Sequence, residues 1–148
     1  MKSPSSTIVL DAAVLISAVF GRSRGAIMAA QQAAVLVTTD RVVHEARRRI
    51  ELGLKRPELV EVLDDLVGSI TIVPILSLEP RQTASETVLR DAVASRNGST
   101  RDAHVLALAR SVDADIWTTD RDFAGTGVAT WSTPNLMRAL AEAATDRR

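Results

Sequence analysis

Hydrophobic and polar positions alternate along the chain in blocks that predict strands separated by helices. The run at residues 7–11 (TIVLD) combines β-branched and aliphatic residues, so it predicts a short buried strand that ends on a carboxylate. Comparable short runs follow at residues 34–37 (AVLV), 70–74 (ITIVP), 115–118 (DIWT) and 128–131 (VATW). The first four predict strands, and the fifth is a weaker candidate for one.

The segments between these runs have the spacing of helices. Val42, Ala46 and Ile50 recur at i, i+4 and i+8, which places them on one face of a helix that begins at residues 39–40. Asp102 and Leu106 share a face in the same way, in a helix capped by residues 99–100. Further helices are predicted over residues 23–34, 57–68, 80–95 and 133–144.

This order of elements predicts one fold class. Strands that are separated by helices and by long connections pair in parallel, so we expect an α/β fold of three layers, α/β/α, with a mostly parallel sheet of four or five strands. No repeat, linker or low-complexity segment divides residues 1–148, which predicts a single domain. In such sheets ligands bind beyond the carboxyl ends of the strands, where the strand order reverses.

Composition narrows the function classes. Hydrophobic residues make up 46% of the chain and charged residues 24%, which is typical of a folded globular protein. The absence of cysteine excludes disulfides, zinc–thiolate sites and thiol nucleophiles. The formal net charge is zero, so the whole molecule has no net field that would attract nucleic acid, and any basic surface must be local.

The chain shows no targeting or membrane segment. The opening MKSPSS lacks the apolar stretch of a secretion signal, and the longest apolar run, AAVLISAVF, is too short to span a bilayer. We therefore expect a cytoplasmic protein with no membrane partner.

Acidic residues stand where four predicted elements would deliver them to a common cleft. Asp11 and Asp120 stand at the ends of predicted strands, while Glu45 and Asp102 border the apolar faces of predicted helices, and Asp122 lies close to Asp120 in sequence. Carboxylates are hard oxygen ligands that suit Mg²⁺ or Mn²⁺, and several in one place repel one another unless cations or protons neutralise them. The set therefore predicts a divalent-metal site.

Each of these residues also has a simpler explanation. Asp11 suits the N-cap of a helix, and Asp102 in a first helical turn is favoured by the helix dipole. Glu45 would pair with the arginines that follow it or be solvated, and Asp120 and Asp122 suit a turn. These explanations stay open for single residues, but they do not account for acidic residues on the same side of one predicted sheet.

The chain resembles the PIN-domain nucleases, most closely the VapC-type toxins of prokaryotic toxin–antitoxin pairs, over nearly its whole length. One part of the resemblance is IVLDAAVLISAV around Asp11. The other is RDAHVLALARSVDADIWTTDRDF, which matches the family's order of Asp, apolar helix, strand, Thr-x-Asp and Asp-Phe. In this sequence those residues are Asp102, Thr118, Asp120, Asp122 and Phe123.

The resemblance implies a PIN-like fold and a ribonuclease that uses Mg²⁺ or Mn²⁺ to hydrolyse RNA phosphodiester bonds. It implies Asp11 and Asp102 as the central metal ligands, Asp120 as a direct or water-mediated ligand, Glu45 as a ligand or water-orienting base, and Asp122 as an auxiliary ligand. Two further residues bear on this set. Thr118 is expected to orient Asp120 through its hydroxyl, and Ala13 stands where the first motif often carries Asn or Ser, which removes a polar contact that would support metal binding.

The resemblance also implies partners. These are an RNA substrate, a cognate antitoxin protein and a second copy of the chain in a homodimer. Arg47, Arg48 and Arg49 follow Glu45, so at least one guanidinium would face the cleft and hold a substrate phosphate, unless all three are only a solvated basic face. With no Tyr, two Phe and two Trp, the sequence shows no obvious base-stacking platform.

The sequence bears on four other functions. A haloacid-dehalogenase-like phosphatase needs a second Asp two residues after the first, and that position is Ala13. A phospho-accepting receiver domain needs a late lysine, whereas this chain has only Lys2 and Lys55. A housekeeping RNA-processing nuclease and a PIN-like domain that binds RNA or protein without cutting it remain open.

Overall fold

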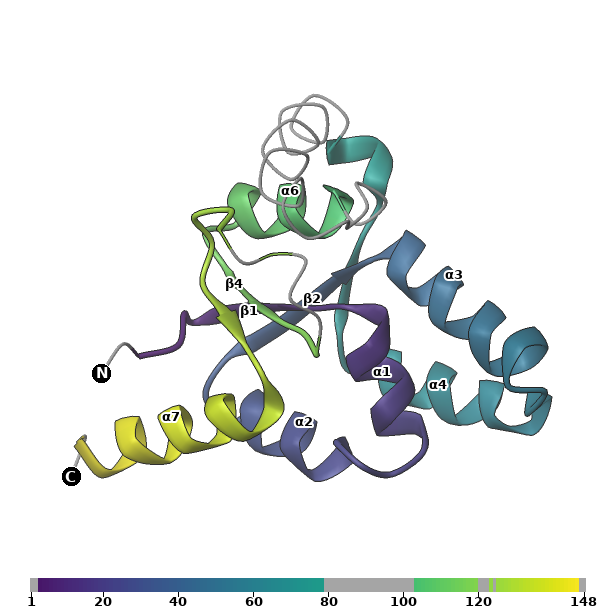
Figure 1. Cartoon of the computed structure of the whole chain (residues 1–148), viewed down its shortest axis with the longest axis horizontal. Coiled ribbons are helices and arrows are strands. Elements are labelled where there is room, and N and C mark those ends of the chain that lie inside the picture. The colour runs from purple at the N-terminus through teal and green to yellow at the C-terminus, as the bar shows by residue number, and fades with distance from the viewer. Residues whose placement is uncertain (1–2, 79–102, 120–122, 124, 147–148) are drawn as a thin grey trace.

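A computed structural model of the chain describes residues 3–78, 103–119, 123 and 125–146 (Figure 1). The described elements are β1 (Thr7–Leu10), α1 (Ala12–Val19), α2 (Arg24–Gln31), β2 (Val35–Thr39), α3 (Asp40–Arg48), the π-helical turn η1 (Arg49–Gly53), the 3₁₀ turn η2 (Pro57–Leu59), α4 (Val60–Val67), β3 (Thr71–Val73), the 3₁₀ turn η3 (Ile75–Leu78), α6 (Ala103–Ser111), β4 (Asp115–Trp117), β5 (Thr130–Trp131) and α7 (Thr133–Asp146).

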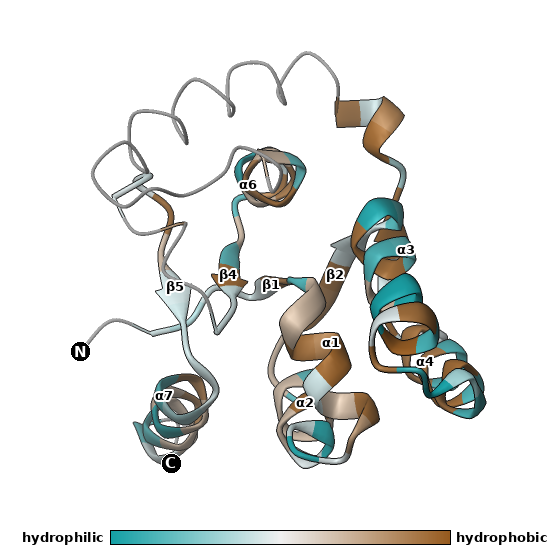
Figure 2. Ribbon diagram, turned by 45° about the vertical axis from the view of Figure 1, so that its right-hand side comes forward, coloured by the Kyte–Doolittle hydropathy of each residue, from teal (hydrophilic) through white to brown (hydrophobic). Residues whose placement is uncertain are grey.

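Five strands form one parallel sheet in the order β3-β2-β1-β4-β5. Helix α6 lies on one face of the sheet, and α1, α2 and α7 lie on the other (Figure 2). The central strands β1 and β4 are largely buried, as expected for parallel strands covered on both faces. This arrangement confirms the three-layer α/β fold and the parallel sheet predicted from the sequence.

The strand order of the sheet reverses at β1. From β1 the chain adds β2 and β3 on one side and returns to add β4 and β5 on the other. Ile8 of β1 pairs with Leu36 of β2 and with Asp115 of β4, so the three strands end close together. The order therefore reverses between β1 and β4, which is where α/β sheets bind their ligands.

Most predicted elements are confirmed within a few residues. Val42, Ala46 and Ile50 are buried, as their helical spacing predicted. Thr39 was expected as one of two possible N-caps of the third helix, and its hydroxyl accepts the Val42 backbone N–H at 3.0 Å. The helix predicted over residues 80–95 lies outside the described residues.

Helix α1 was not predicted as a helix. Its residues are apolar on nearly every side, so they lack the polar face that reveals an amphipathic helix, and only Asp11 indicated a helix start. Asp11 is indeed the N-cap, because its Oδ1 atom accepts the Val14 backbone N–H at 3.1 Å. The helix therefore begins directly at the end of β1.

No single described helix is long and apolar enough to cross a membrane. Helices α1 and α2 reach the required length and apolarity only as a consecutive pair, and that pair is bent by 115°.

Candidate active site at the carboxyl ends of β1 and β4

Asp11 lies at the point where the strand order reverses, with 8% of its surface exposed. Its Oδ1 atom accepts the Val14 N–H in the first turn of α1, and its Oδ2 atom accepts the hydroxyl hydrogen of Thr118. Its own backbone N–H donates to the Trp117 carbonyl at 3.3 Å. Two strands and one helix therefore fix the position of this carboxylate.

Capping a helix does not by itself exclude metal binding by Asp11. An ionised carboxylate offers about four lone-pair sites, so it can accept hydrogen bonds and coordinate a cation at the same time. The donors Val14 and Thr118 each contact one of its two oxygens, which leaves lone pairs on the carboxylate for a hard cation. The two interpretations of Asp11 are therefore compatible.

Thr118 directly follows β4 and is 3% exposed. The sequence led us to expect that its hydroxyl orients Asp120, and the structure shows a contact with Asp11. Asp120 lies outside the described residues, so the expected contact stays a prediction. Thr118 therefore supports the site through Asp11, a carboxylate 107 positions earlier in the sequence.

Glu45 is half-buried on α3, beside the buried Val42 and Ala46. At 3.6 residues per turn, Arg48 and Arg49 lie on the same flank of α3 as Glu45. Arg47 lies about 200° round the helix from Glu45 and forms an ion pair with Asp64 of α4. The three consecutive arginines therefore face different surroundings.

Asp102, Asp120 and Asp122 lie outside the described residues. The first described residue of α6 is Ala103, which follows Asp102 in the sequence, and Thr118 precedes Asp120 by two positions. Within the part of the chain that the structure describes, no three His, Cys, Asp or Glu side chains are grouped closely enough to hold a metal ion. The full ligand set therefore stays a prediction, with Asp11 as its best-defined member.

Two threonines at the end of β2 connect the elements around Asp11. The Thr38 hydroxyl donates to the carbonyl of Leu10, the residue before Asp11, at 2.8 Å. The Thr39 hydroxyl oxygen lies 2.8 Å from Nδ1 of His104 in α6, and all of these groups are buried. Thr39 thus connects α3, which carries Glu45, to α6, which follows Asp102. Sequence reasoning identified only the capping role of Thr39.

His104 is neutral at physiological pH. Its burial and, to a lesser extent, the positive charge of Arg41 lower its pKa to about 4, although the negative charge of Asp40 partly offsets both effects. The Thr39 hydroxyl accepts the Val42 N–H and also forms the hydrogen bond with His104 Nδ1, so the neutral imidazole has a buried hydrogen-bond partner. His104 therefore serves as a neutral packing and hydrogen-bonding group.

Known proteins resemble this chain both in sequence pattern and in fold. A family model described as PIN domain matches residues 9–141. A comparison with curated proteins finds no match. Among solved structures, VapBC2 from Rickettsia felis bound to a DNA fragment from its promoter is similar, with a TM-score of 0.66, 12% identity, and coverage of 85% of this chain and 98% of that one.

Two further solved structures have the same fold. FitAcB from Neisseria gonorrhoeae matches with a TM-score of 0.62 and 17% identity, over 87% of this chain and 99% of that one. VapC20 from Mycobacterium tuberculosis, described as a sarcin–ricin loop cleaving toxin, matches with a TM-score of 0.63 and 15% identity, over 82% and 96%. At these identities the structures establish the shared fold.

Proposed function

This chain belongs to the PIN domain family, and on that basis we propose that it is a metal-dependent endoribonuclease, the toxin of a type II toxin–antitoxin pair. The observation that carries the proposal is the buried carboxylate of Asp11 at the strand-order reversal, held by Thr118 and by the first turn of α1. A buried carboxylate that two neighbouring groups hold in place at the reversal of strand order suits a hard divalent cation.

The residues proposed to hold the metal are Asp11, Glu45, Asp102 and Asp120, with Asp122 as an auxiliary ligand. One or two Mg²⁺ or Mn²⁺ ions bound there would activate water and neutralise charge on the phosphate. Asp11 contributes a carboxylate whose direction is set by Thr118. Glu45 projects from the flank of α3 and binds metal or orients the attacking water.

The proposed partners are an RNA substrate, an antitoxin protein and a second copy of the chain, in the cytoplasm. Support for an antitoxin comes from the Rickettsia felis VapBC2 structure, and support for RNA comes from the description of VapC20 as a toxin that cleaves the sarcin–ricin loop. Arg48 and Arg49 share the flank of Glu45 and are exposed, so they are better placed than Arg47 to hold a substrate phosphate.

Cleavage of RNA by the purified protein tests this function. We expect cleavage of mixed RNAs with Mg²⁺ or Mn²⁺ and none with EDTA. Asp11→Asn should lower the cleavage rate by more than about 100-fold, because it removes the charge of a metal ligand. Changes to groups that only support a ligand usually have smaller effects. Asp65→Asn, the same change at an exposed position of α4, is the control and should cleave normally. Cleavage that persists in EDTA or in Asp11→Asn would contradict the proposal.

The two remaining alternatives give different results. Ala13 in α1 favours a non-catalytic PIN-like domain because the polar side chain common in the first motif is missing, and that function predicts RNA or protein binding without cleavage. A housekeeping nuclease predicts cleavage without growth arrest. We expect growth arrest on expression, relieved by Asp11→Asn and by a small neighbouring open reading frame that encodes the antitoxin.

A further inference from the structure

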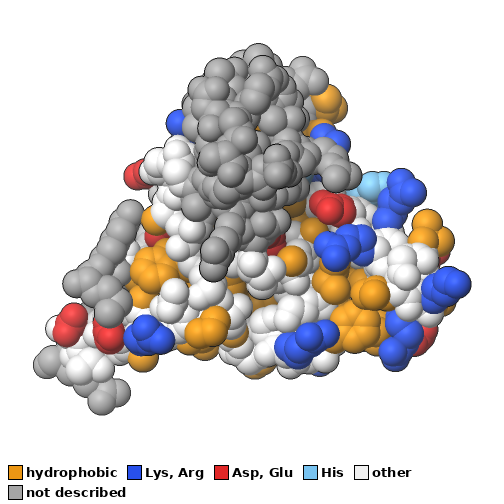
Figure 3. Space-filling model, viewed as in Figure 1, with side chains coloured by type: hydrophobic (Ala, Val, Ile, Leu, Met, Phe, Trp, Pro, Cys, Tyr) orange, Lys and Arg blue, Asp and Glu red, His pale blue; other side chains and the backbone are white. Residues whose placement is uncertain are grey.

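Positive charge is concentrated in one part of a chain that is neutral as a whole. Residues 20–56 contain eight basic and three acidic residues, a net charge of +5, whereas the complete chain has a net charge of zero. Lys and Arg side chains lie around exposed hydrophobic ones at the lower right of the molecule (Figure 3). Part of this excess is offset by the acidic residues that follow, since Asp64 pairs with Arg47 and Glu58 pairs with Arg56.

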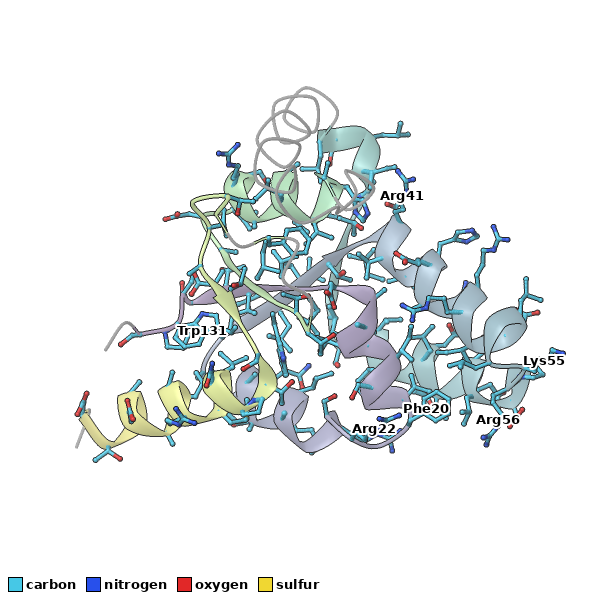
Figure 4. All side chains as sticks on the ribbon, in the orientation of Figure 1. Phe20, Arg22, Arg41, Lys55, Arg56 and Trp131 are labelled. Atoms are coloured by element: carbon cyan, nitrogen blue, oxygen red, sulfur yellow. The ribbon has the colours of Figure 1, made fainter. Side chains whose placement is uncertain are left out.

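One aromatic ring lies within this basic region. Phe20, the C-cap of α1, is half-buried, and the guanidinium carbon of Arg56 lies 5.9 Å from the centroid of its ring. Arg22 follows Phe20 by two positions and Lys55 precedes Arg56, so all four side chains lie at one edge of the molecule (Figure 4). We call these four residues the Phe20 surface.

Two of its cations have no ion-pair partner within the described residues. Arg56 donates from Nε to Glu58 at 2.5 Å, and the basic region's Arg47 pairs with Asp64, whereas Arg22 and Lys55 are exposed and form no ion pair there. Cations that are exposed and not neutralised by acidic neighbours are available to an anionic ligand.

Lys55 also adopts an uncommon backbone conformation. Its φ angle is +56°, in the left-handed region that usually favours Gly or Asn. The turn is held by the backbone N–H of Arg56, which donates to the Ile50 carbonyl at 2.9 Å, and by that of Leu54, which donates to Arg49 at 2.7 Å. A long cationic side chain is thus displayed at a position where a glycine would be less strained.

We propose that the Phe20 surface binds single-stranded RNA next to the cleavage site. This inference rests on the proposed ribonuclease function and assigns the substrate a path. Arg22 and Lys55 would pair with phosphates, and the ring of Phe20 together with the Arg56 guanidinium would stack against a base. RNA is favoured over an acidic peptide because a peptide carboxylate would use the cations but has no need of the aromatic ring.

The distance from Asp11 fits this path. Asp11 caps one end of α1 and Phe20 caps the other, so the eight-residue helix separates them by about 12 Å. At about 3.4 Å per nucleotide, that length corresponds to three or four nucleotides of a stacked strand. A strand whose cleaved phosphate lies at Asp11 would therefore bring its flanking nucleotides to the Phe20 surface.

Binding of a fluorescently labelled oligouridylate to the full-length protein tests this path. All variants carry Asp11→Asn, so that RNA is not cut, and Kd is measured over a range of salt concentrations. Arg22→Glu and Lys55→Glu should each weaken binding and reduce the slope of log Kd against log salt by about 0.7, the value for one lost phosphate contact. Arg138→Glu, the same charge change on exposed α7, is the control and should keep the full slope.

The ring is tested separately. Phe20→Leu should weaken binding by at least about fivefold with little change in the salt slope, because stacking involves no charge. Phe20→Tyr keeps the aromatic ring and should restore binding. A Leu variant that binds as well as the Tyr variant would remove the stacking role.

The remaining outcomes overturn the inference. If Arg138→Glu weakens RNA binding as much as Arg22→Glu and Lys55→Glu do, RNA affinity depends only on the total charge of the protein. Loss of polyglutamate binding with unchanged RNA binding in the Arg22 and Lys55 variants would assign the surface to an acidic protein partner. If the wild type cleaves RNA but these variants bind it normally, the path is wrong and the ribonuclease function stands. If the wild type cleaves no RNA, that function fails.

Discussion

Asp11 combines a structural and a proposed chemical role in one side chain. The hydrogen bonds that make it a helix cap also hold the carboxylate still, and its second oxygen depends on the hydroxyl of Thr118. A ligand that is oriented by neighbouring donors loses little freedom when a cation binds, so these donors affect metal affinity as well as stability. The residues that support Asp11 therefore become the most informative ones to mutate.

Thr118→Val should weaken metal binding. It keeps the shape of the side chain but removes the hydroxyl that donates to Asp11, and loss of such a supporting hydrogen bond reduces metal affinity about 10- to 100-fold. Thr118→Ser retains the hydroxyl and should restore affinity. Titration calorimetry with Mn²⁺ measures both, and equal affinity in the Val and Ser variants would show that the hydroxyl has no such role.

Thr39→Val should destabilise the protein by about 2–3 kcal/mol. The change removes the N-cap of α3 and leaves the buried Nδ1 atom of His104 without its hydrogen-bond partner. Thr39→Ser keeps both hydrogen bonds and should lie close to the wild type. Urea unfolding gives the free energies, and similar values for Val and Ser would mean that packing alone determines stability at this position.

His104 should make the metal-free protein less stable in mild acid. Its pKa is about 4 in the folded state against about 6.5 in the unfolded state, so protonation favours unfolding. Its contribution is complete above pH 6.5 and is lost as the pH falls towards 4, by up to about 3 kcal/mol. Unfolding in EDTA at several pH values should show this slope, and the slope should be smaller in His104→Gln.

At the scale of single elements, helix α3 separates its arginines by direction. Arg47 turns towards α4 and pairs with Asp64, while Arg48 and Arg49 share the flank of Glu45. The sequence shows only three consecutive arginines, and helical spacing alone does not tell which flank faces a cleft. The packing partner of α3 supplies that information.

Arg49→Ala should therefore raise KM for RNA cleavage, because it removes a cation on the flank of Glu45. Arg47→Ala should leave KM within about twofold, because Arg47 is paired with Asp64. Loss of that exposed ion pair should lower the stability of the fold by at most about 1 kcal/mol. The two variants remove the same charge from neighbouring positions, so each is the control for the other. Equal increases in KM would indicate that net charge, and not direction, determines RNA binding.

The sequence predicted those elements whose apolar spacing is one-sided. The helix around Val42 and Ala46 was recognisable because polar residues mark its outer face. Helix α1 was not, because it is apolar on nearly every side. The same limit applies to the site: a carboxylate after a strand is visible in sequence, but the bonds from Thr118 to Asp11 and from Thr39 to His104 depend on how distant elements pack.

At the scale of the whole molecule, the acidic residues proposed to bind metal would repel one another and oppose folding unless a cation is present. Bound metal stabilises the folded state in proportion to its occupancy, by about 2.7 kcal/mol when its concentration is one hundred times Kd. The strand order that brings β1 and β4 together is what makes this coupling possible.

Mn²⁺ should therefore raise the Tm of the wild type relative to EDTA, and the increase should disappear in Asp11→Asn. Thermal unfolding followed by circular dichroism measures it, and Asp65→Asn should respond like the wild type. An identical Tm with Mn²⁺ and with EDTA would contradict metal binding by the folded protein.

The hydrogen bond between Thr118 and Asp11 also determines when, during translation, the candidate active site around Asp11 can form. The two residues are 107 positions apart, and β4, which pairs with β1, is among the last strands to be made. During translation, the ribosome synthesises Asp11 long before it synthesises β4 and the Thr118 hydroxyl that holds the Asp11 carboxylate. A nuclease of this fold would thus be incomplete while it is translated, and a copy that ends before β4 would lack the hydrogen bond that holds its Asp11 carboxylate.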